Sequence, residues 1–377
     1  MLGFSFSIIN TQLNMEPNNN RLLSLDFYRG LTMFLLIAEF SSLFEFLVSP
    51  ELKGTFIHTI GEQFHHVEWE GLHFWDLIQP FFMFIVGVSM PLSFSKRMAK
   101  GDTYKELQRH AFKRAFLMLV LGWALYCIDP GKIVFRFQNV LAQLSVTYLL
   151  AFLVIRKKPM VQIGFSIILI LISEAIYRFF SVEGFNHAFV PGENFGAWFN
   201  ILISGEEDGG HWAMFNAIPT AAHTIWGVLA GQLLISKRTT KEKIRLLIVG
   251  GVTALIIGYG FSYVTPIIKR ISTSTFVFVG GGWSILALAL CYWVIDLKKY
   301  QKGVLFFAVV GMNPLFIYLF AHVGGAELIR KIFLPFSNAL FGWTGALSAN
   351  ILLSILVLLF LWFICFWMYK KKLFIRI

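Results

Sequence analysis

Charged residues are scarce in this sequence. Only 14% of its 377 residues are Asp, Glu, Lys or Arg, whereas 57% are hydrophobic. Because soluble globular domains carry about 25% charged residues, this composition excludes an ordinary soluble protein. The apolar runs are long enough to cross a bilayer as helices, which satisfy every backbone hydrogen bond within their own segment. We therefore predict an all-α, polytopic integral membrane protein.

Cysteine is scarce too, and acidic residues are outnumbered. The cysteines at positions 127, 291 and 365 all lie in apolar stretches, so we expect no disulfide framework and no metal ion. The 32 Lys and Arg residues exceed the 21 Asp and Glu residues by 11, which would suggest nucleic acid in a soluble chain. Here they fall in short loops between apolar runs, as in cytoplasmic loops of membrane proteins. No nucleic-acid partner is expected.

The apolar runs predict about ten transmembrane helices. With a cytoplasmic N-terminus, 24 of the 32 basic residues fall on the cytoplasmic side and eight outside, so both termini are expected to be cytoplasmic. We predict a short cytoplasmic tail (1–28), a transmembrane domain (29–369) and a basic cytoplasmic tail (370–377), in the cytoplasmic (inner) membrane. The expected spans are 29–48, 74–95, 112–128, 137–156, 160–180, 213–236, 244–265, 275–296, 303–323 and 345–369. The long outer loops are 49–73 and 181–212, and a shorter outer loop is 324–344.

The densest group of proton-transfer side chains lies just before and at the start of the second span, at its outer end. Three histidines, three carboxylates and two tryptophans stand between residues 64 and 76: His65, His66, Glu68, Trp69, Glu70, His73, Trp75 and Asp76. Ionisable groups at this depth are costly to desolvate and are therefore functional candidates. The alternative is an interfacial belt that anchors the helix at the lipid headgroups. A belt accounts for Trp75 but not for so many carboxylates beside the imidazoles.

Polar side chains also recur inside the expected spans. Arg29 follows Asp26 by three residues and either pairs with it or receives an anionic ligand such as a phosphate. Glu39, expected near mid-membrane, needs a partner or a water-filled cavity. Other polar residues either cross-link helices or line the same interior: Gln143, Asn313 and His322. Together they predict a channel-like cavity, basic at the cytoplasmic end and rich in imidazole and carboxylate groups at the outer end.

Two blocks of the sequence resemble a known enzyme family. The first block, residues 21–33, contains Leu25-Asp26-Phe27-Tyr28-Arg29-Gly30. The second is His66-x-x-Trp69-x-Gly71-Leu72, followed by Asp76-Leu77 and Pro80-x-Phe82-x-Phe84-Ile85-x-Gly87-x-Ser89. Both resemble the heparan-α-glucosaminide N-acetyltransferase family, with weaker matches around residues 139–143, 227–231 and 311–322.

The resemblance implies an enzyme that moves an acetyl group from cytosolic acetyl-CoA to an extracytoplasmic amino sugar, such as terminal glucosamine or a short glycan ending in it. His66 matches the family's catalytic histidine, and Asp76 matches a carboxylate near it. Glu39 stands where the family has Asn. The expected donor contacts are Arg29, Glu39, Gln143, Asn313 and His322, and the expected acceptor contacts are His65, Glu68, Trp69 and Glu70. The oligomeric state stays open, a homodimer included.

Transfer from a thioester to an amine needs a base and a stabiliser of the developing oxyanion. His66 can act as the base, with Asp76 fixing its tautomer, or can carry the acetyl group itself. Two other functions compete. A ten-span O-acyltransferase of surface glycans also opens with Leu-Asp-x-x-Arg-Gly, but it lacks the second block. A proton-coupled sugar transporter would use Glu39 and His66 as a relay, but no internal repeat supports it.

Overall fold

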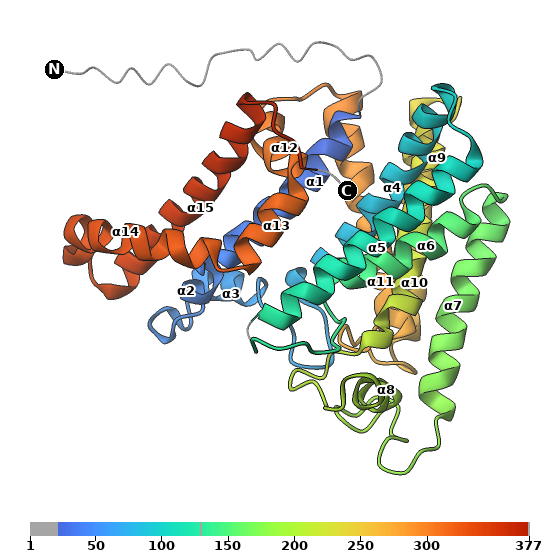
Figure 1. Ribbon diagram of the computed structural model, residues 1–377, viewed down its shortest axis with the longest axis horizontal. Coiled ribbons are helices and arrows are strands. Elements are labelled where there is room, and N and C mark those ends of the chain that lie inside the picture. Colours follow the sequence, from blue (N-terminus) through green and yellow to red (C-terminus); the bar gives the residue numbers. More distant parts are fainter. Residues whose placement is uncertain (1–21, 129, 376–377) are drawn as a thin grey trace.

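The computed structural model describes residues 22–128 and 130–375, and in these the only β-type pairing is one isolated bridge. Residues 1–21 and 376–377, parts of the two predicted tails, lie outside the described residues. Figure 1 shows α1 beginning and α15 ending at the upper end of the bundle, which we call the tail end, while α8 lies at the opposite end. The cytoplasmic location of the tail end stays a prediction from the basic residues.

The helices follow one another in the order of the predicted apolar runs. The longer ones are α1 (Leu23–Phe40), α4 (Ile78–Ala99), α5 (Tyr104–Ile128), α6 (Val140–Val154), α7 (Pro159–Phe179), α9 (Ala217–Ile235), α10 (Thr240–Phe261), α11 (Ser274–Cys291), α14 (Gly325–Phe341) and α15 (Ala346–Lys370). The shorter ones are α2 (Leu43–Leu47), η2 (Pro50–Leu52), α3 (Phe56–Glu62), η3 (Phe74–Leu77), α8 (Phe195–Ser204), η4 (Met214–Asn216), η5 (Tyr292–Leu297), α12 (Val304–Met312), α13 (Pro314–His322) and η6 (Gly342–Thr344).

The architecture is that of a polytopic membrane protein, but the count of ten spans is not confirmed. Seven helices of the described chain are long and apolar enough to cross a membrane, and the pair α12–α13 makes an eighth if it is one bent span. The other two predicted spans correspond to α1 and α6. α1 has 18 residues, among them Asp26, Arg29 and Glu39, and α6 has only 15 residues, fewer than the 20 or so that span the hydrocarbon core.

The outer segment 324–344, predicted as a loop, instead forms the amphipathic helix α14. Its charged residues interrupt the apolar run, so hydropathy alone misses a helix whose apolar residues keep helical spacing. Arg330 fixes α14 to its neighbours by donating hydrogen bonds to the Ser41 carbonyl (3.2 Å), Ser354 Oγ (3.0 Å) and Asn350 Oδ1 (3.2 Å). The predicted loop 181–212 likewise contains a helix, α8.

The span between residues 304 and 322 is broken at Asn313. α12 and α13 meet there at a bend of 70°, because Pro314 lacks the N–H that a continuous helix requires. The buried Asn313 amide binds the chain that follows α15: Nδ2 donates to the Leu373 carbonyl (2.9 Å), and Oδ1 accepts from the Ile375 N–H (3.0 Å). The C-terminal tail is thereby held against the break.

Glycines of the two sequence blocks lie where helix backbones touch. A Cβ on Gly87 would lie 2.0 Å from the Thr224 carbonyl oxygen, and a Cβ on Gly227 would lie 2.2 Å from that of Phe84. α4 and α9 therefore cross in close contact, as small residues permit in membranes. Gly30 plays the same part between α1 and α12, since its Cβ would meet the Phe307 carbonyl oxygen at 2.0 Å. These motif residues serve packing.

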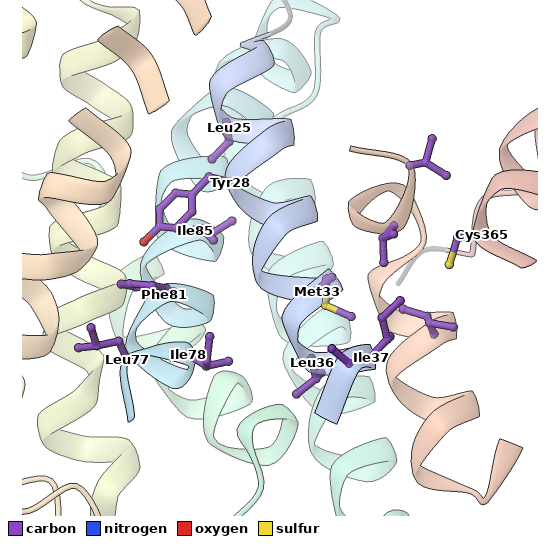
Figure 2. Packing of buried hydrophobic residues seen from close by; sticks show 14 of the residues in the cluster. Leu25, Tyr28, Met33, Leu36, Ile37, Leu77, Ile78, Phe81, Ile85 and Cys365 are labelled. Atoms are coloured by element: carbon purple, nitrogen blue, oxygen red, sulfur yellow. The ribbon is translucent and has the colours of Figure 1, made fainter. Parts of the chain in front are cut away.

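Apolar packing fixes α1 against α4. Figure 2 shows Tyr28 of α1 beside Phe81 and Ile85 of α4, and the Tyr28 and Phe81 rings meet edge to face at 5.4 Å. Toward the other end of α1, Leu36 belongs to the same buried cluster. The packing of this cluster holds the last turn of α1 beside η3, and η3 immediately precedes α4.

Candidate active site

Three loops meet at the end of the bundle opposite the tail end, which we call the site end (Figure 1). The loop after α3 pairs with the α10–α11 loop through an antiparallel bridge between Glu70 and Ile268. The loop after α8 joins them, because the Ala213 N–H donates to the Arg270 carbonyl at 2.9 Å. Helix packing thus brings together segments that lie far apart in the sequence.

His66 and Asp76 form an imidazole–carboxylate pair at this junction. His66 Nδ1 lies 2.8 Å from Asp76 Oδ1. The carboxylate is 1% exposed, and its Oδ2 also accepts the backbone N–H groups of His73 (2.9 Å) and Val67 (3.5 Å). These two backbone bonds hold the carboxylate in place independently of its contact with the imidazole. The side chain of His66 is 33% exposed, and within the described chain its ring hydrogen bonds all involve Nδ1, which leaves Nε2 for a ligand.

Lys269 is a third member of the site, and the sequence analysis missed it. Its Nζ lies 3.1 Å from His66 Nδ1 and 3.6 Å from Asp76 Oδ1, and the residue is only 7% exposed. It stands 203 positions from His66, in a loop where the sequence marks it only as one of the outer basic residues. No local pattern connects the two, so only the tertiary structure reveals the contact.

The surroundings shift the titration of both basic groups. Burial lowers the pKa of His66 below its ordinary value, and the Lys269 ammonium lowers it further, against the raising effect of Asp76. Burial also lowers the pKa of Lys269, to about 8, although Asp76 and Glu39 favour its charged form. The imidazole is therefore neutral at physiological pH, as a proton acceptor must be.

Aromatic rings surround the imidazole–carboxylate pair. The Trp212 ring lies 5.2 Å from the His66 ring in an edge-to-face arrangement. Trp69, predicted to contact the acceptor, donates from Nε1 to the Phe189 carbonyl (2.7 Å) and lies 6.1 Å from the His211 ring. His211 in turn is 2.7 Å from Glu207. Such an apolar and carboxylate-bearing rim suits stacking and hydrogen bonding to a sugar.

Comparison with known proteins now separates the candidate families. The family model described as heparan-alpha-glucosaminide N-acetyltransferase, catalytic, matches residues 21–264, well over half of the chain. The chain belongs to this acetyltransferase family. It is 30% identical over 139 residues to the heparan-alpha-glucosaminide N-acetyltransferase of Mus musculus and 30% identical over 138 residues to that of Homo sapiens. Each alignment covers 34% of this chain and 18% of the relative, so the chain matches less than a fifth of the relatives' length.

Membership of the acetyltransferase family confirms the resemblance drawn from the two sequence blocks. The matched segment includes the imidazole–carboxylate pair and the glycines at the helix crossings. Lys269 lies just beyond residue 264, where the match ends.

Glu39 and His322 lie near the site end. α1 ends at Phe40, so Glu39 occupies its last turn, and its depth in a membrane stays a prediction. The Glu39 side chain is exposed and accepts a hydrogen bond from Trp75 Nε1 at 3.1 Å. The His322 ring packs against the Phe40 ring at 4.6 Å. Glu39 thus contacts the residue next to Asp76, and His322 contacts the residue next to Glu39.

Gln143 belongs to a buried row of amides between α4 and α6. Gln79, three residues after Asp76, donates to Gln143 Oε1, and Gln143 Nε2 donates to the Gln138 carbonyl at 3.0 Å. The Gln138 side-chain oxygen is buried without a hydrogen-bond partner in the described chain. Polar side chains therefore continue from the imidazole–carboxylate pair into the space between α4 and α6.

Arg29 and Asn313 lie away from the pair, toward the tail end. Arg29 Nη2 donates to Ser89 Oγ at 2.5 Å, which links α1 to α4. The Asn313 amide is engaged by the C-terminal tail, so a ligand would have to displace the tail to bind it. A role for either residue in donor binding stays a prediction.

The remaining predicted residues surround the pair without joining it. His65 Nδ1 lies 2.9 Å from the Gly61 carbonyl at the end of α3, and the His65 carbonyl is 2.9 Å from His73 Nδ1. Both rings thus hold the backbone of the turn that carries His66. Glu68 and Glu70 are exposed, on the stretch that pairs with the α10–α11 loop, where an acceptor could reach them.

Proposed function

We propose that the protein transfers an acetyl group from acetyl-CoA to the amine of an extracytoplasmic amino sugar. The observation that carries this proposal is the imidazole of His66, bonded at Nδ1 to a buried carboxylate and open at Nε2. That arrangement suits a general base or an acyl carrier, and it lies in a chain of the acetyltransferase family.

In direct transfer, Nε2 of His66 removes a proton from the acceptor amine as the amine nitrogen attacks the thioester carbon. The C–S bond then breaks, and the proton passes from Nε2 to the departing sulfur. In the two-step alternative, Nε2 attacks the thioester carbon first, and the C–S bond breaks to release CoA as its thiolate. The amine then attacks the acetyl-imidazole, the N–C bond to Nε2 breaks, and the amine proton passes to the thiolate. Asp76 serves either route, because it stabilises positive charge on the imidazole and fixes the tautomer with an unprotonated Nε2.

The donor is proposed to enter from the tail end, on the cytoplasmic side of the inner membrane. Basic residues concentrate in the loops of that end, and Arg29 faces α4 there, so CoA phosphates have cationic partners on this side. Glu39, Gln143 and His322 are proposed to line the path of the donor to the pair. Asn313 joins them only if the tail moves away.

The acceptor is proposed to be a small amino sugar that enters from the site end. Trp69 offers an apolar ring, and the exposed carboxylates of Glu68 and Glu70 lie on the same stretch of chain. An ammonium group on the acceptor would favour such carboxylates. Glucosamine and oligosaccharides that end in it are the simplest acceptors with this chemistry.

The test uses purified protein in lipid nanodiscs with radiolabelled acetyl-CoA and glucosamine. We expect N-acetylglucosamine to form, and His66→Ala to abolish its formation while His65→Ala, the matched control, retains it. Acceptance of heparan chains but not of glucosamine or its short oligomers would overturn the proposed acceptor. Glucosamine uptake into vesicles without acetylation would favour a transporter instead.

A further inference from the structure

The contacts of His66 Nδ1 contain a chemical conflict. This one nitrogen lies 2.8 Å from Asp76 Oδ1 and 3.1 Å from Lys269 Nζ. A protonated Nδ1 donates to the carboxylate but cannot accept from an ammonium. An unprotonated Nδ1 accepts from the ammonium but then has nothing to donate to Asp76. The position of Lys269 therefore bears directly on which ring nitrogen carries the proton.

Lys269 is held firmly enough to exert this influence. Its side chain is almost wholly buried, and its Nζ lies 5.4 Å from the centre of the Trp212 ring. It also lies 3.6 Å from Asp76 Oδ1, so an ammonium here forms an ion pair with the carboxylate while Nδ1 donates a hydrogen bond to it. In that arrangement Nε2 is unprotonated and can act as a base.

We propose that Lys269 is a positioning residue that keeps His66 neutral and sets the pH at which Nε2 becomes a base. The role rests on the proposed acetyl transfer, but the charge effect on the imidazole does not. A positive charge next to Nδ1 disfavours a second positive charge on the ring. Lys269 also neutralises Asp76, which would otherwise favour the imidazolium form.

The charged groups around the pair determine whether removal of the Lys269 charge raises or lowers the pKa of His66. Asp76 raises the pKa of His66, whereas burial, Lys269 and Arg270 lower it. Asp76 and Glu39 favour the charged form of Lys269, whose pKa is about 8, and Arg270 opposes it. Below about pH 8 Lys269 is therefore mainly protonated. Replacing it by an uncharged residue removes a repulsion, so the pKa of His66 must rise.

The critical variants are Lys269→Met, which keeps an unbranched side chain without the charge, and Lys269→Arg, which keeps the charge. Lys331→Met is the matched control, because Lys331 is an exposed lysine that pairs with Glu327 on α14. Lys269→Gln gives a second uncharged variant if the Met variant does not fold. Each protein is first checked for monodisperse elution in nanodiscs.

The readout that does not depend on activity is the reaction of His66 with diethylpyrocarbonate, which acylates an imidazole ring only in its unprotonated form. Peptide mass spectrometry locates the modification at His66 across pH 5–9. We expect the midpoint of the pH profile to rise by about one unit or more in Lys269→Met. Lys269→Arg and Lys331→Met should keep the wild-type midpoint.

The acidic limb of acetyl transfer should shift in parallel with this midpoint. An unchanged His66 midpoint in both uncharged variants, Lys269→Met and Lys269→Gln, would overturn the proposal, as would a shift of the same size in Lys331→Met. Failure of the proposed function has a different signature. In that case wild-type protein transfers no acetyl group, while the His66 midpoint still responds to the charge at residue 269.

Discussion

The change Asp76→Asn tests the proposed orientation of the catalytic imidazole with almost no change in volume. In the wild type the buried carboxylate accepts from His66 Nδ1 at 2.8 Å and from the His73 N–H at 2.9 Å. The Asn oxygen can keep the backbone bond. Its NH₂ group must then take the place of Oδ1 and point at the imidazole.

An amide NH₂ in that position reverses the tautomer of His66. It can only donate to an unprotonated Nδ1, which requires that the ring proton sit on Nε2. The general base is then lost, an effect worth about 10²–10⁴ in rate. We expect kcat to fall by a factor within this range for Asp76→Asn, while the binding of CoA, whose phosphates are proposed to lie toward the tail end, changes little.

Stability should be largely retained, because Lys269 can adapt. Asp76 favours the charged form of Lys269, so its removal lowers the pKa of Lys269 below about 8, and the lysine can become neutral instead of remaining an unpaired buried charge. Any loss of stability should therefore be smaller at pH 8 than at pH 6.

The assay combines initial rates of acetyl transfer, calorimetric titration with CoA, and thermal unfolding followed by tryptophan fluorescence. Asp76→Glu is not a suitable control, since it moves the carboxylate by a methylene group. His66→Ala supplies the reference for complete loss. Wild-type kcat in Asp76→Asn would refute the orientation argument. A large fall in the melting temperature of Asp76→Asn, or the loss of its unfolding transition, would show a structural role instead.

Three further predictions concern single positions. His66→Ala should lower turnover at least about 10²-fold. His65→Ala should remove one backbone contact worth about 1 kcal/mol and keep most of the activity. If a rate assay showed the larger loss in His65→Ala, the base would have to be reassigned to His65. Gly87→Ala should lower the melting temperature markedly, since its Cβ would lie 2.0 Å from a carbonyl oxygen of α9, whereas Gly164→Ala, with nothing within 4 Å, should not; equal melting temperatures would contradict the close helix crossing. Asn313→Ala should release the C-terminal tail and speed hydrogen exchange at residues 373–375, and unchanged protection there would show that other contacts hold the tail.

Hydropathy and charge were sufficient to predict the class of protein and the order of most helices. These properties act locally, because a segment partitions into lipid according to its own side chains. They fail where a helix is short, bent or amphipathic, as in α6, at Asn313 and in α14. α14 is stabilised by Arg330, whose partners lie on α15 and at the end of α1, and no local pattern reports such a contact.

The sequence by itself supplied His66 and Asp76 as a catalytic pair, through the resemblance of its second block to the family, and the two residues lie only ten positions apart. Only the tertiary structure decided that Lys269 completes the site and that the tail occupies Asn313. Both contacts span large stretches of chain, 203 residues for Lys269 and 60 for the tail. They depend on how the helices pack and on which distant segments that packing brings together. The pattern of residues within a loop carries no record of its distant partner, so Lys269, the second basic group of the site, is found only when the helices are packed.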